Sequence, residues 1–261
     1  MATLNVCGLP SALPSSIERA PEFGRRLDAM DLDVINFQEV FTGRALAAIR
    51  AGLPSFPHVG WRRGFHGQPA GGLATFSRHP IGAVSFRSFL GIVPARGGLR
   101  FRAKRAVNSV LQGVLSVALD GLGVVIGNTH LTANKDGDWS SANRYHTYQR
   151  AQLDRLQAHA RTQHMAIVTG DFNIASVSPL YPRIVDGGAW QDPFAEADPT
   201  TFHGEFLPPG SSPHRIDYVL VRDLPVLDTA VLFAEPVTLP DGRESFLSDH
   251  LALAVVVAQA G

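Results

Sequence analysis

The chain contains one cysteine and no long apolar run. The single cysteine among its 261 residues, Cys7, excludes an internal disulfide framework and a cysteine-based zinc site. The longest uninterrupted apolar run, Leu251 to Ala258, is far shorter than the roughly 20 residues that a membrane-spanning helix needs. Residues 1–10 lack the basic and apolar segments of a signal peptide. We expect either a cytoplasmic protein or a secreted one that has been trimmed, which leaves the localisation open.

Acidic residues are missing from one long stretch of the chain. The formal net charge is zero, from 23 Lys plus Arg against 23 Asp plus Glu. Between Val40 and Leu119 there is no Asp or Glu, but there are eleven basic residues, whereas the rest of the chain carries twelve basic and 23 acidic residues. Overall neutrality argues against a general attraction to polyanions. The basic stretch is nevertheless a segregated charge that attracts anions locally.

The composition predicts a globular protein with a sizeable core. Hydrophobic residues make up 45% and charged residues 18% of the sequence. Neither a Ser/Pro-rich linker nor an internal repeat divides the chain, so we predict one domain over residues 1–261. The stretch 86–112 has no regular pattern and is predicted to be an insertion or a mobile rim.

Short apolar segments alternate with helical patterns. Three helices are predicted, from Ser15 toward Met30 with a kink or break at Pro21, over Thr42–Ala51, and over Asn143–Thr162. The predicted strands are Ala2–Cys7, Val34–Phe37, Gly72–Phe76, Gly82–Phe86, Gly113–Leu119, Val124–Asn128, Ala166–Thr169, Ile216–Val221, Val226–Phe233 and Leu251–Val257. Because ten strands exceed one ordinary sheet, we predict an α/β sandwich of two mixed sheets face to face with helices outside.

Polar side chains gather where these predicted strands end. They are Asn5, Glu39, His130, Asp171, Asn173, Asp217, Asp249 and His250. Glu39 offers a hard oxygen ligand, and Asn5, Asp171, Asn173 and Asp249 can add oxygens directly or through water. Such a set suits Mg²⁺, with Mn²⁺ or another divalent ion as an alternative.

The two histidines of this set add proton chemistry to the predicted metal site. His130 and His250 can move protons near neutral pH, and a carboxylate such as Asp217 can hold one imidazole in the required tautomer. An oxygen-ligated cation with two histidines is suited to hydrolysis of a phosphate ester, in which one histidine activates water and the other protonates the leaving oxygen.

Seven motifs carry a resemblance to a known superfamily. They are Leu-Asn-Val-x-Gly-Leu at 4–9, Phe-Gln-Glu-Val at 37–40, Gly-Gly-Leu-x-x-x-Ser-Arg-x-Pro-Ile at 71–81, Asn-Thr-His-Leu at 128–131, Gly-Asp-Phe-Asn at 170–173, Arg-Ile-Asp-Tyr at 215–218 and Ser-Asp-His at 248–250. In this order they resemble the endonuclease/exonuclease/phosphatase superfamily, which has the deoxyribonuclease-I-like fold. The first and fourth motifs are similar to the neutral sphingomyelinase branch.

The resemblance implies a four-layer αββα sandwich and a role for each polar residue. It implies that Glu39 is the principal metal ligand, assisted by Asn5 and Asp249, and that Asp217 orients a water-activating His250. It further implies that Asp171 positions the nucleophile or the metal, that Asn173 contacts the scissile phosphate, and that His130 contacts the phosphate or protonates the leaving group. Related enzymes support the equivalent of His130 with a Glu from the preceding strands. The acid-free stretch offers none, so a carbonyl, an amide, water or an acid from elsewhere must orient His130.

Two features of the basic stretch leave alternatives open. Arg78, after a predicted strand, is either a phosphate contact or a surface residue. The segment 86–105 mixes apolar and basic residues, and three interpretations fit it: a lip that enters a membrane surface, a groove that follows a nucleic-acid backbone, or an insertion packed on its own domain.

The function predicted from the sequence is that of a Mg²⁺-dependent phosphodiesterase. Its first expected substrate is a phospholipid headgroup diester, as for a sphingomyelinase. The alternatives are a DNA or RNA nuclease, a phosphoinositide or other phosphomonoester phosphatase, and a non-catalytic binding module of the same fold. The sequence indicates a phosphate-ester substrate and no protein partner.

Overall fold

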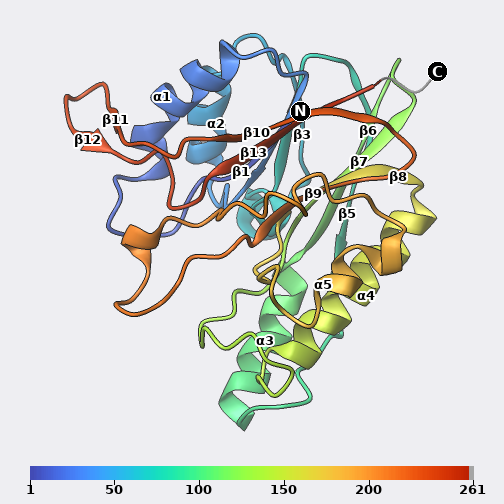
Figure 1. The fold of residues 1–261 in the computed structure, drawn as a ribbon. Coiled ribbons are helices and arrows are strands. Elements are labelled where there is room, and N and C mark those ends of the chain that lie inside the picture. Colours follow the sequence, from blue (N-terminus) through green and yellow to red (C-terminus); the bar gives the residue numbers. More distant parts are fainter. Residues whose placement is uncertain (259–261) are drawn as a thin grey trace.

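A computed structural model describes residues 1–258 and shows two β-sheets packed face to face (Figure 1). The first sheet has the strand order β10 (Val226–Leu232), β13 (Ala252–Val257), β1 (Ala2–Asn5), β2 (Val34–Gln38), β4 (Ala74–Ser77) and β3 (His58–Gly60). The second has the order β5 (Ile81–Ser88), β6 (Gly113–Leu119), β7 (Val124–His130), β8 (Met165–Asp171) and β9 (Asp217–Val221). Each sheet is mixed, because β1–β2 and β7–β8 are parallel pairs and the other pairs are antiparallel.

Helices cover the outer faces of both sheets. The first sheet packs against α1 (Ser16–Asp28) and α2 (Gly43–Ala51), which share a core with it around Phe23 and Ile49. The second packs against α4 (His146–Thr162) and α5 (Tyr181–Ile184), around Leu153. A third apolar cluster, including Leu115, Val117, Val219, Leu253 and Val255, fills the space between the sheets. This confirms the predicted αββα sandwich. None of the helices within residues 1–258 has the length and apolar character to cross a membrane.

The helix signals in the sequence are largely confirmed. Ser15 caps α1, and its side chain and that of Glu18 form the reciprocal bonds of a capping box. Of the kink or break expected at Pro21, the break is wrong, because α1 continues to Asp28. Proline removes only one backbone bond, to the carbonyl of Ile17, and that residue is exposed, so water can replace the lost donor. The last predicted helix, α4, begins three residues later than expected.

Each predicted strand is present, and three very short strands were missed. These are β3 and the separate pair formed by β11 (Val237–Thr238) and β12 (Glu244–Ser245). The expectation of an irregular stretch over 86–112 is also corrected. Strand β5 continues to Ser88, and α3 (Leu99–Leu111) occupies the second half of the stretch, at the lower end of the molecule in Figure 1.

A layer of polar side chains joins the two sheets on the side nearest the strand ends of the predicted site. Asn36 on β2 donates to Thr169 Oγ1 on β8 (Nδ2–Oγ1 2.9 Å) and accepts from Thr75 Oγ1 on β4 (2.6 Å). Gln38 on β2 donates to Asn128 Oδ1 on β7 (2.7 Å). All five side chains are buried, so the bonds fix how one sheet lies against the other. We call these five residues the polar seam.

Candidate active site

Strand register brings the predicted site residues to one edge of the sandwich. In the first sheet, Asn5 pairs with Gln38, the neighbour of Glu39. In the second, His130 pairs with Asp171, which in turn pairs with Asp217. Residues that lie far apart in the sequence therefore meet at adjacent strand ends, where the sheets hold them rigidly and the loops leave them accessible.

Glu39 is held at the start of the loop after β2 by backbone and side-chain donors. Its Oε2 accepts from the backbone N of Gly8 (3.0 Å), and its Oε1 accepts from Asn5 Nδ2 (3.3 Å). Glu39 has a φ of +61°. A Cβ on Gly8 would lie 1.8 Å from the carbonyl oxygen of Glu39, so only glycine permits this approach of the two loops.

Asn5 links Glu39 to Asp171 across the two sheets. Its Nδ2 also donates to Asp171 Oδ2 (3.0 Å), while its Oδ1 accepts from the backbone N of Cys7 (3.0 Å). Asn5 thus positions both carboxylates through its amide nitrogen, and its oxygen is already bonded to Cys7. The role of Asn5 as an assisting metal ligand stays a prediction.

Asp171 lies at the centre of the cluster and is buried. It accepts two bonds from Asn173, to Oδ1 from the backbone N (2.8 Å) and to Oδ2 from Nδ2 (2.9 Å). The tight turn that allows both bonds places Asn173 at a φ of +52°, which Asn tolerates better than most residues. Burial, and next the charge of Asp217, raise the pKa of Asp171 to about 6.

His250 and Asp217 form a buried hydrogen-bonded pair. His250 Nδ1 lies 2.9 Å from Asp217 Oδ2, and His250 Nε2 lies 3.8 Å from Asp171 Oδ2. Burial alone would lower the pKa of His250, but the carboxylates of Asp217 and Asp171 outweigh it and raise the pKa to about 10. Because Nδ1 is bonded to Asp217, Nε2 is the nitrogen that faces the centre of the cluster.

His130 finds its acidic partners outside the acid-free stretch. Its Nε2 lies 3.4 Å from Asp171 Oδ2 and 3.9 Å from Glu39 Oε1. The absence of an acid between Val40 and Leu119 therefore does not leave His130 without a carboxylate. Of the four possibilities that the sequence left open, the structure shows an acid from elsewhere in the chain.

The donor set of the cluster fits a hard divalent cation. Carboxylate oxygens of Glu39 and Asp171 converge on Asn5, and Asp171, Asp217 and His250 each offer a ligand atom within 4.8 Å of the others. Within residues 1–258, these three carboxylates form ion pairs with histidine only and with no Lys or Arg. Concentrated buried negative charge with oxygen donors is the environment that Mg²⁺ or Mn²⁺ favours.

Two further predicted site residues, Asp249 and Arg78, form other contacts in the structure. The side chain of Asp249 accepts from Ser248 Oγ (3.3 Å) and raises the pKa of the already buried Cys7 thiol, so it lies on the Cys7 side of the site. Its role as a metal ligand stays a prediction.

The predicted phosphate contact of Arg78 is corrected. Arg78 follows β4 at the end that pairs with Val34, which is the opposite end of β2 from Glu39. Its guanidinium donates to the carbonyls of Asp28 and Met30 at the end of α1 (3.2 and 3.0 Å) and lies over the ring of Phe56. A cation at a helix C-terminus is stabilising, so Arg78 has a structural role.

The structure adds two supporting residues that belong to none of the sequence motifs. Thr201 Oγ1 accepts from the backbone N of Ile216 and of Asp217 (both 3.0 Å) and so fixes the start of β9. The ring of Phe202 packs edge-on against that of His250, with centroids 5.0 Å apart. Both lie in an irregular loop without a motif, and only the tertiary structure brings them to the site.

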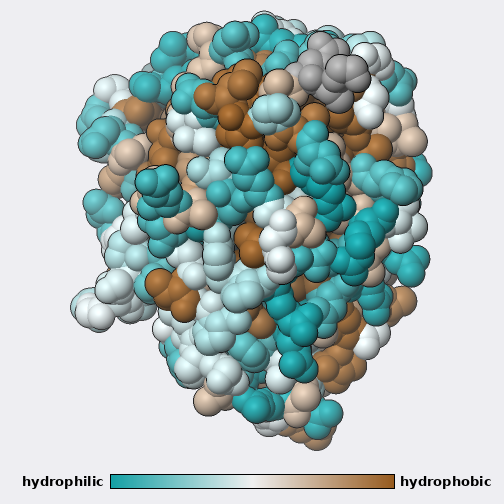
Figure 2. All heavy atoms as spheres, turned by 45° about the vertical axis from the view of Figure 1, so that its right-hand side comes forward, coloured by the Kyte–Doolittle hydropathy of each residue, from teal (hydrophilic) through white to brown (hydrophobic). Residues whose placement is uncertain are grey.

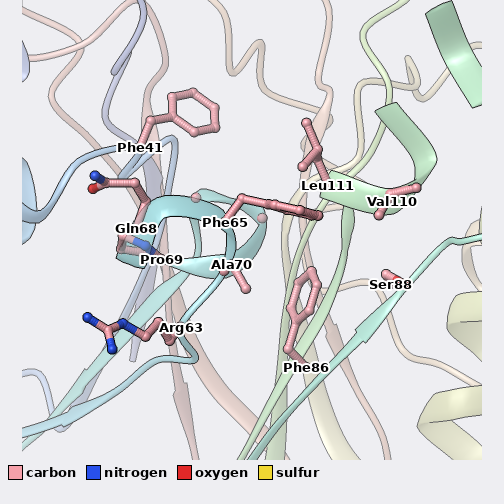
Figure 3. A pocket seen from close by; sticks show the side chains of 13 residues that line it. Phe41, Arg63, Phe65, Gln68, Pro69, Ala70, Phe86, Ser88, Val110 and Leu111 are labelled. Atoms are coloured by element: carbon pink, nitrogen blue, oxygen red, sulfur yellow. The ribbon is translucent and has the colours of Figure 1, made fainter. Parts of the chain in front are cut away.

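A cavity of about 550 Å³ opens beside Glu39. Figure 3 shows Phe65, Phe86 and Leu111 pointing toward one another on one side of it, with Arg63 at another edge. Gly72 also lines the cavity, and a Cβ placed on Gly72 would lie 3.3 Å from Glu39 Cα. The cavity is therefore mainly apolar, with the basic side chain of Arg63 at its edge, and it adjoins the carboxylate cluster.

Residues 2–250 match the Endonuclease/Exonuclease/phosphatase family, so the chain belongs to this family. Its members are generally hydrolases that act on phosphate esters. This confirms the superfamily expected from the motifs. A comparison with curated proteins gives no significant match.

Solved structures of several related proteins have the same fold. Sphingomyelinase C from Streptomyces griseocarneus is 18% identical, with a TM-score of 0.68 over 99% of this chain and 98% of that chain. A variant of beta toxin from Staphylococcus aureus with bound magnesium ions is 16% identical, with a TM-score of 0.68 over 97% of both chains. TDP2 from D. rerio, in complex with a single-strand DNA product, is 15% identical, with a TM-score of 0.68 over 99% of this chain and 98% of that chain.

Proposed function

We propose that this chain is a divalent-cation-dependent phosphodiesterase and that its substrate is a phospholipid headgroup diester. The observation that carries the proposal is the convergence of Glu39, Asp171 and the Asp217–His250 pair around one point at the edge of the sandwich. Similarity to a sphingomyelinase and a beta toxin supports the lipid class. The apolar cavity beside Glu39 supports it too, because a lipid diester carries a large apolar group next to its phosphate.

In this proposal Glu39 and Asp171, supported by Asn5, would hold Mg²⁺ or a similar ion, and Asp249 is a further candidate ligand. When bound, the cation would neutralise charge on the phosphate and on the attacking oxygen. His250 takes the proton of the attacking water at Nε2, and Asp217 and Asp171 stabilise the imidazolium that results. Without a bound cation the charges of Asp217 and Asp171 raise the pKa of His250. A cation held by Asp171 would offset this negative charge and favour the neutral imidazole that can accept the proton.

His130 and Asn173 face the same centre from the second sheet. His130 Nε2 lies near two carboxylates at the same edge, where it could protonate the leaving oxygen or contact the phosphate. The Asn173 amide donates to Asp171 and to the carbonyl of Leu131 (2.9 and 3.1 Å). It thereby keeps Asp171 in place beside the position proposed for the phosphate.

A nucleic-acid phosphodiester is the second candidate substrate. The eleven basic residues between Val40 and Leu119, and the similarity to TDP2 in complex with DNA, favour it. A phosphomonoester such as a phosphoinositide, and binding without catalysis, are the remaining hypotheses. A single set of assays separates all four.

The assay offers sphingomyelin vesicles, supercoiled plasmid and phosphoinositides to the purified chain with Mg²⁺ or with EDTA. We expect release of a lipid headgroup that requires the cation and that Glu39→Gln abolishes. The matched control is Glu196→Gln, at an exposed position away from the cluster. Plasmid nicking without lipid cleavage would show that the substrate is a nucleic acid and not a phospholipid. Turnover in EDTA would contradict the cation-dependent mechanism.

Thermal unfolding tests the metal site without a substrate. An ion that binds only the folded state stabilises it, by about 2.7 kcal/mol at a concentration near 100 times its Kd. We expect Mg²⁺ to raise the Tm of the wild type and of Glu196→Gln but not of Glu39→Gln. An equal rise in all three proteins would place the ion elsewhere.

A further inference from the structure

Helix α3 presents its apolar side chains to solvent. Leu99, Val107 and Leu111 are 83%, 64% and 47% exposed, whereas Arg105 and Ser109 on the opposite face are buried. The intervals of four residues from Leu99 through Ala103 and Val107 to Leu111 place these residues along one stripe. A helix on the surface of a globular protein normally turns such a stripe toward the core. Helix α3 does the opposite, because its apolar stripe faces solvent.

The inward face of α3 is fixed, so the orientation of the stripe is set by the fold. The backbone carbonyl of Arg105 accepts from Tyr148 Oη on α4 (2.8 Å). Phe101 packs edge-on against Tyr145 with ring centroids 5.0 Å apart, and Arg144 lies over the ring of Phe101. These contacts use the polar and aromatic side of α3 and leave the aliphatic side uncovered.

Basic side chains border the stripe. Arg100, Arg102 and Lys104 are exposed, and none of them forms an ion pair with any residue in the described part of the chain. No acid occurs between Val40 and Leu119, so α3 lies in a segment whose charge has one sign. Figure 2 shows hydrophobic and hydrophilic spheres side by side at the lower end of the molecule, where Figure 1 places α3.

The stripe leads to the cavity beside Glu39. Leu111, its last residue, lines this cavity together with Phe65, which is 66% exposed, and Phe86 (Figure 3). The apolar surface is thus continuous from the first turn of α3 to the rim of the candidate active site. We call α3 and Phe65 together the apolar rim.

We propose that the apolar rim docks on the surface of a phospholipid bilayer that contains anionic lipids. Leu99, Val107 and Leu111 would enter the boundary between headgroups and acyl chains, and Arg100 and Lys104 would lie against lipid phosphates. Docking itself is independent of catalysis. The orientation it gives rests on the proposed function, because it brings the cavity and Glu39 to the membrane surface where a phospholipid diester lies.

The charges and the side-chain types favour a bilayer over other occupants. In a symmetric contact between two copies, each copy would present the same basic helix to the other, and α3 has no acid to neutralise it. A groove for single-stranded nucleic acid uses aromatic side chains for base stacking, whereas the exposed face of α3 is aliphatic. At a bilayer surface, lipid phosphates lie directly above an apolar layer, so one helix can contact both at once.

Flotation with vesicles tests the proposal on the full chain in EDTA, so that no hydrolysis is needed. The probes are vesicles of phosphatidylcholine alone and vesicles in which one quarter of the lipid is phosphatidylserine. We expect the wild type to bind the anionic vesicles more strongly. The double variant Leu99→Ser/Val107→Ser should bind at least about tenfold more weakly, because two apolar side chains no longer leave water. Arg100→Ser should lower the affinity about fivefold, and less at high salt.

Matched controls separate docking from a loss of folding. Leu227→Ser removes an apolar side chain of similar exposure (65%) on β10, and Arg44→Ser removes an exposed cation from α2. Both should bind vesicles as the wild type does. All variants should keep the wild-type Tm, since the replaced side chains lie in solvent.

Three results would overturn the proposal. They are absence of wild-type binding to both vesicles, unchanged binding of the α3 variants, and a wild-type dimer that Val107→Ser dissociates. Failure of the proposed function leaves a different signature, in which the chain binds anionic vesicles through α3 but hydrolyses no lipid with Mg²⁺ present.

Discussion

The active-site edge and helix α3 depart in opposite ways from the usual distribution of side chains. At the edge, Asp171, Asp217 and His250 are buried although they are ionisable, and on α3, Leu99 and Val107 are exposed although they are apolar. The buried charges have partners inside the molecule, whereas the described residues leave most of the surface of these apolar side chains uncovered. The fold itself supplies partners for the buried charges, whereas the exposed apolar side chains of α3 point to a partner outside the molecule.

The balance at the active-site edge is only partial. Asp217 is bonded to His250 and is supported by the backbone bonds that Thr201 organises. Asp171 receives donors from Asn5 and Asn173, yet its pKa is raised because burial and Asp217 disfavour its charge. Unpaired buried charge is costly, so a cation at this point would stabilise the folded protein.

The largest expected effect comes from removing the buried imidazole of His250 at the active-site edge. His250→Ala should lower kcat for a soluble phosphodiester such as bis(p-nitrophenyl) phosphate by a factor on the order of 10³, since it removes the imidazole that Asp217 orients as the proposed general base and His130 has no such partner at Nδ1 among the described residues. Circular dichroism should show that the sandwich persists. Steady-state kinetics with Mg²⁺ measure the loss.

The matched control for this variant is His164→Asn. His164 is exposed and has a φ of +50°, a conformation that Asn also adopts, so neither fold nor activity should change. A His250→Ala protein that retains more than about one tenth of the wild-type kcat would contradict the role of general base.

An intermediate effect is expected in the polar seam, whose buried side chains are polar but uncharged. Asn36→Ala removes the partner of both Thr75 and Thr169 and leaves their hydroxyls in a dry environment. The free energy of unfolding should fall by about 2–3 kcal/mol in urea denaturation. Activity should also fall, because the bonds hold the two halves of the site in register.

Asn108→Ala on α3 provides the comparison for the seam. Asn108 is only partly buried, and its side chain forms no hydrogen bond among residues 1–258. The same change of side chain should therefore alter the unfolding free energy by less than about 0.5 kcal/mol. Equal destabilisation by the two variants would show that the seam is not a special feature of the interface between the sheets.

The sequence was sufficient for most of the site because short motifs lie at strand ends. Asp171 and Asn173 follow a buried strand, and register then fixes their distance from His130 and Asp217. Arg78 shows the limit of this inference. It also belongs to a motif and follows a strand, but β4 runs antiparallel to β2, so its far end leads away from Glu39. A residue's presence in a motif therefore does not reveal in which direction its strand runs.

Helix α3 was missed for a physical reason. Helices are recognised by an apolar stripe that matches a core, and in the segment 86–112 the apolar and basic residues were assigned to an irregular stretch. The structure shows that the two halves differ, because Phe89 and Ile92 are buried before α3 begins, whereas the apolar residues of α3 face outward. In α3 the polar side chains of Arg105 and Ser109 face the domain, so the usual pattern of an apolar face toward the core is absent.

The smallest expected effect is that of Leu99→Ala on α3, measured against the same substitution at a buried leucine. Leu153→Ala, on α4, removes a fully buried side chain from the core and should lower the free energy of unfolding by about 2–5 kcal/mol. Leu99→Ala, on α3, removes a side chain that is 83% exposed and should change it by less than about 0.5 kcal/mol. Urea denaturation measures both. If Leu99→Ala destabilised the protein as strongly as Leu153→Ala, α3 would be packed against the domain in solution, and its apolar side chains would need no external partner.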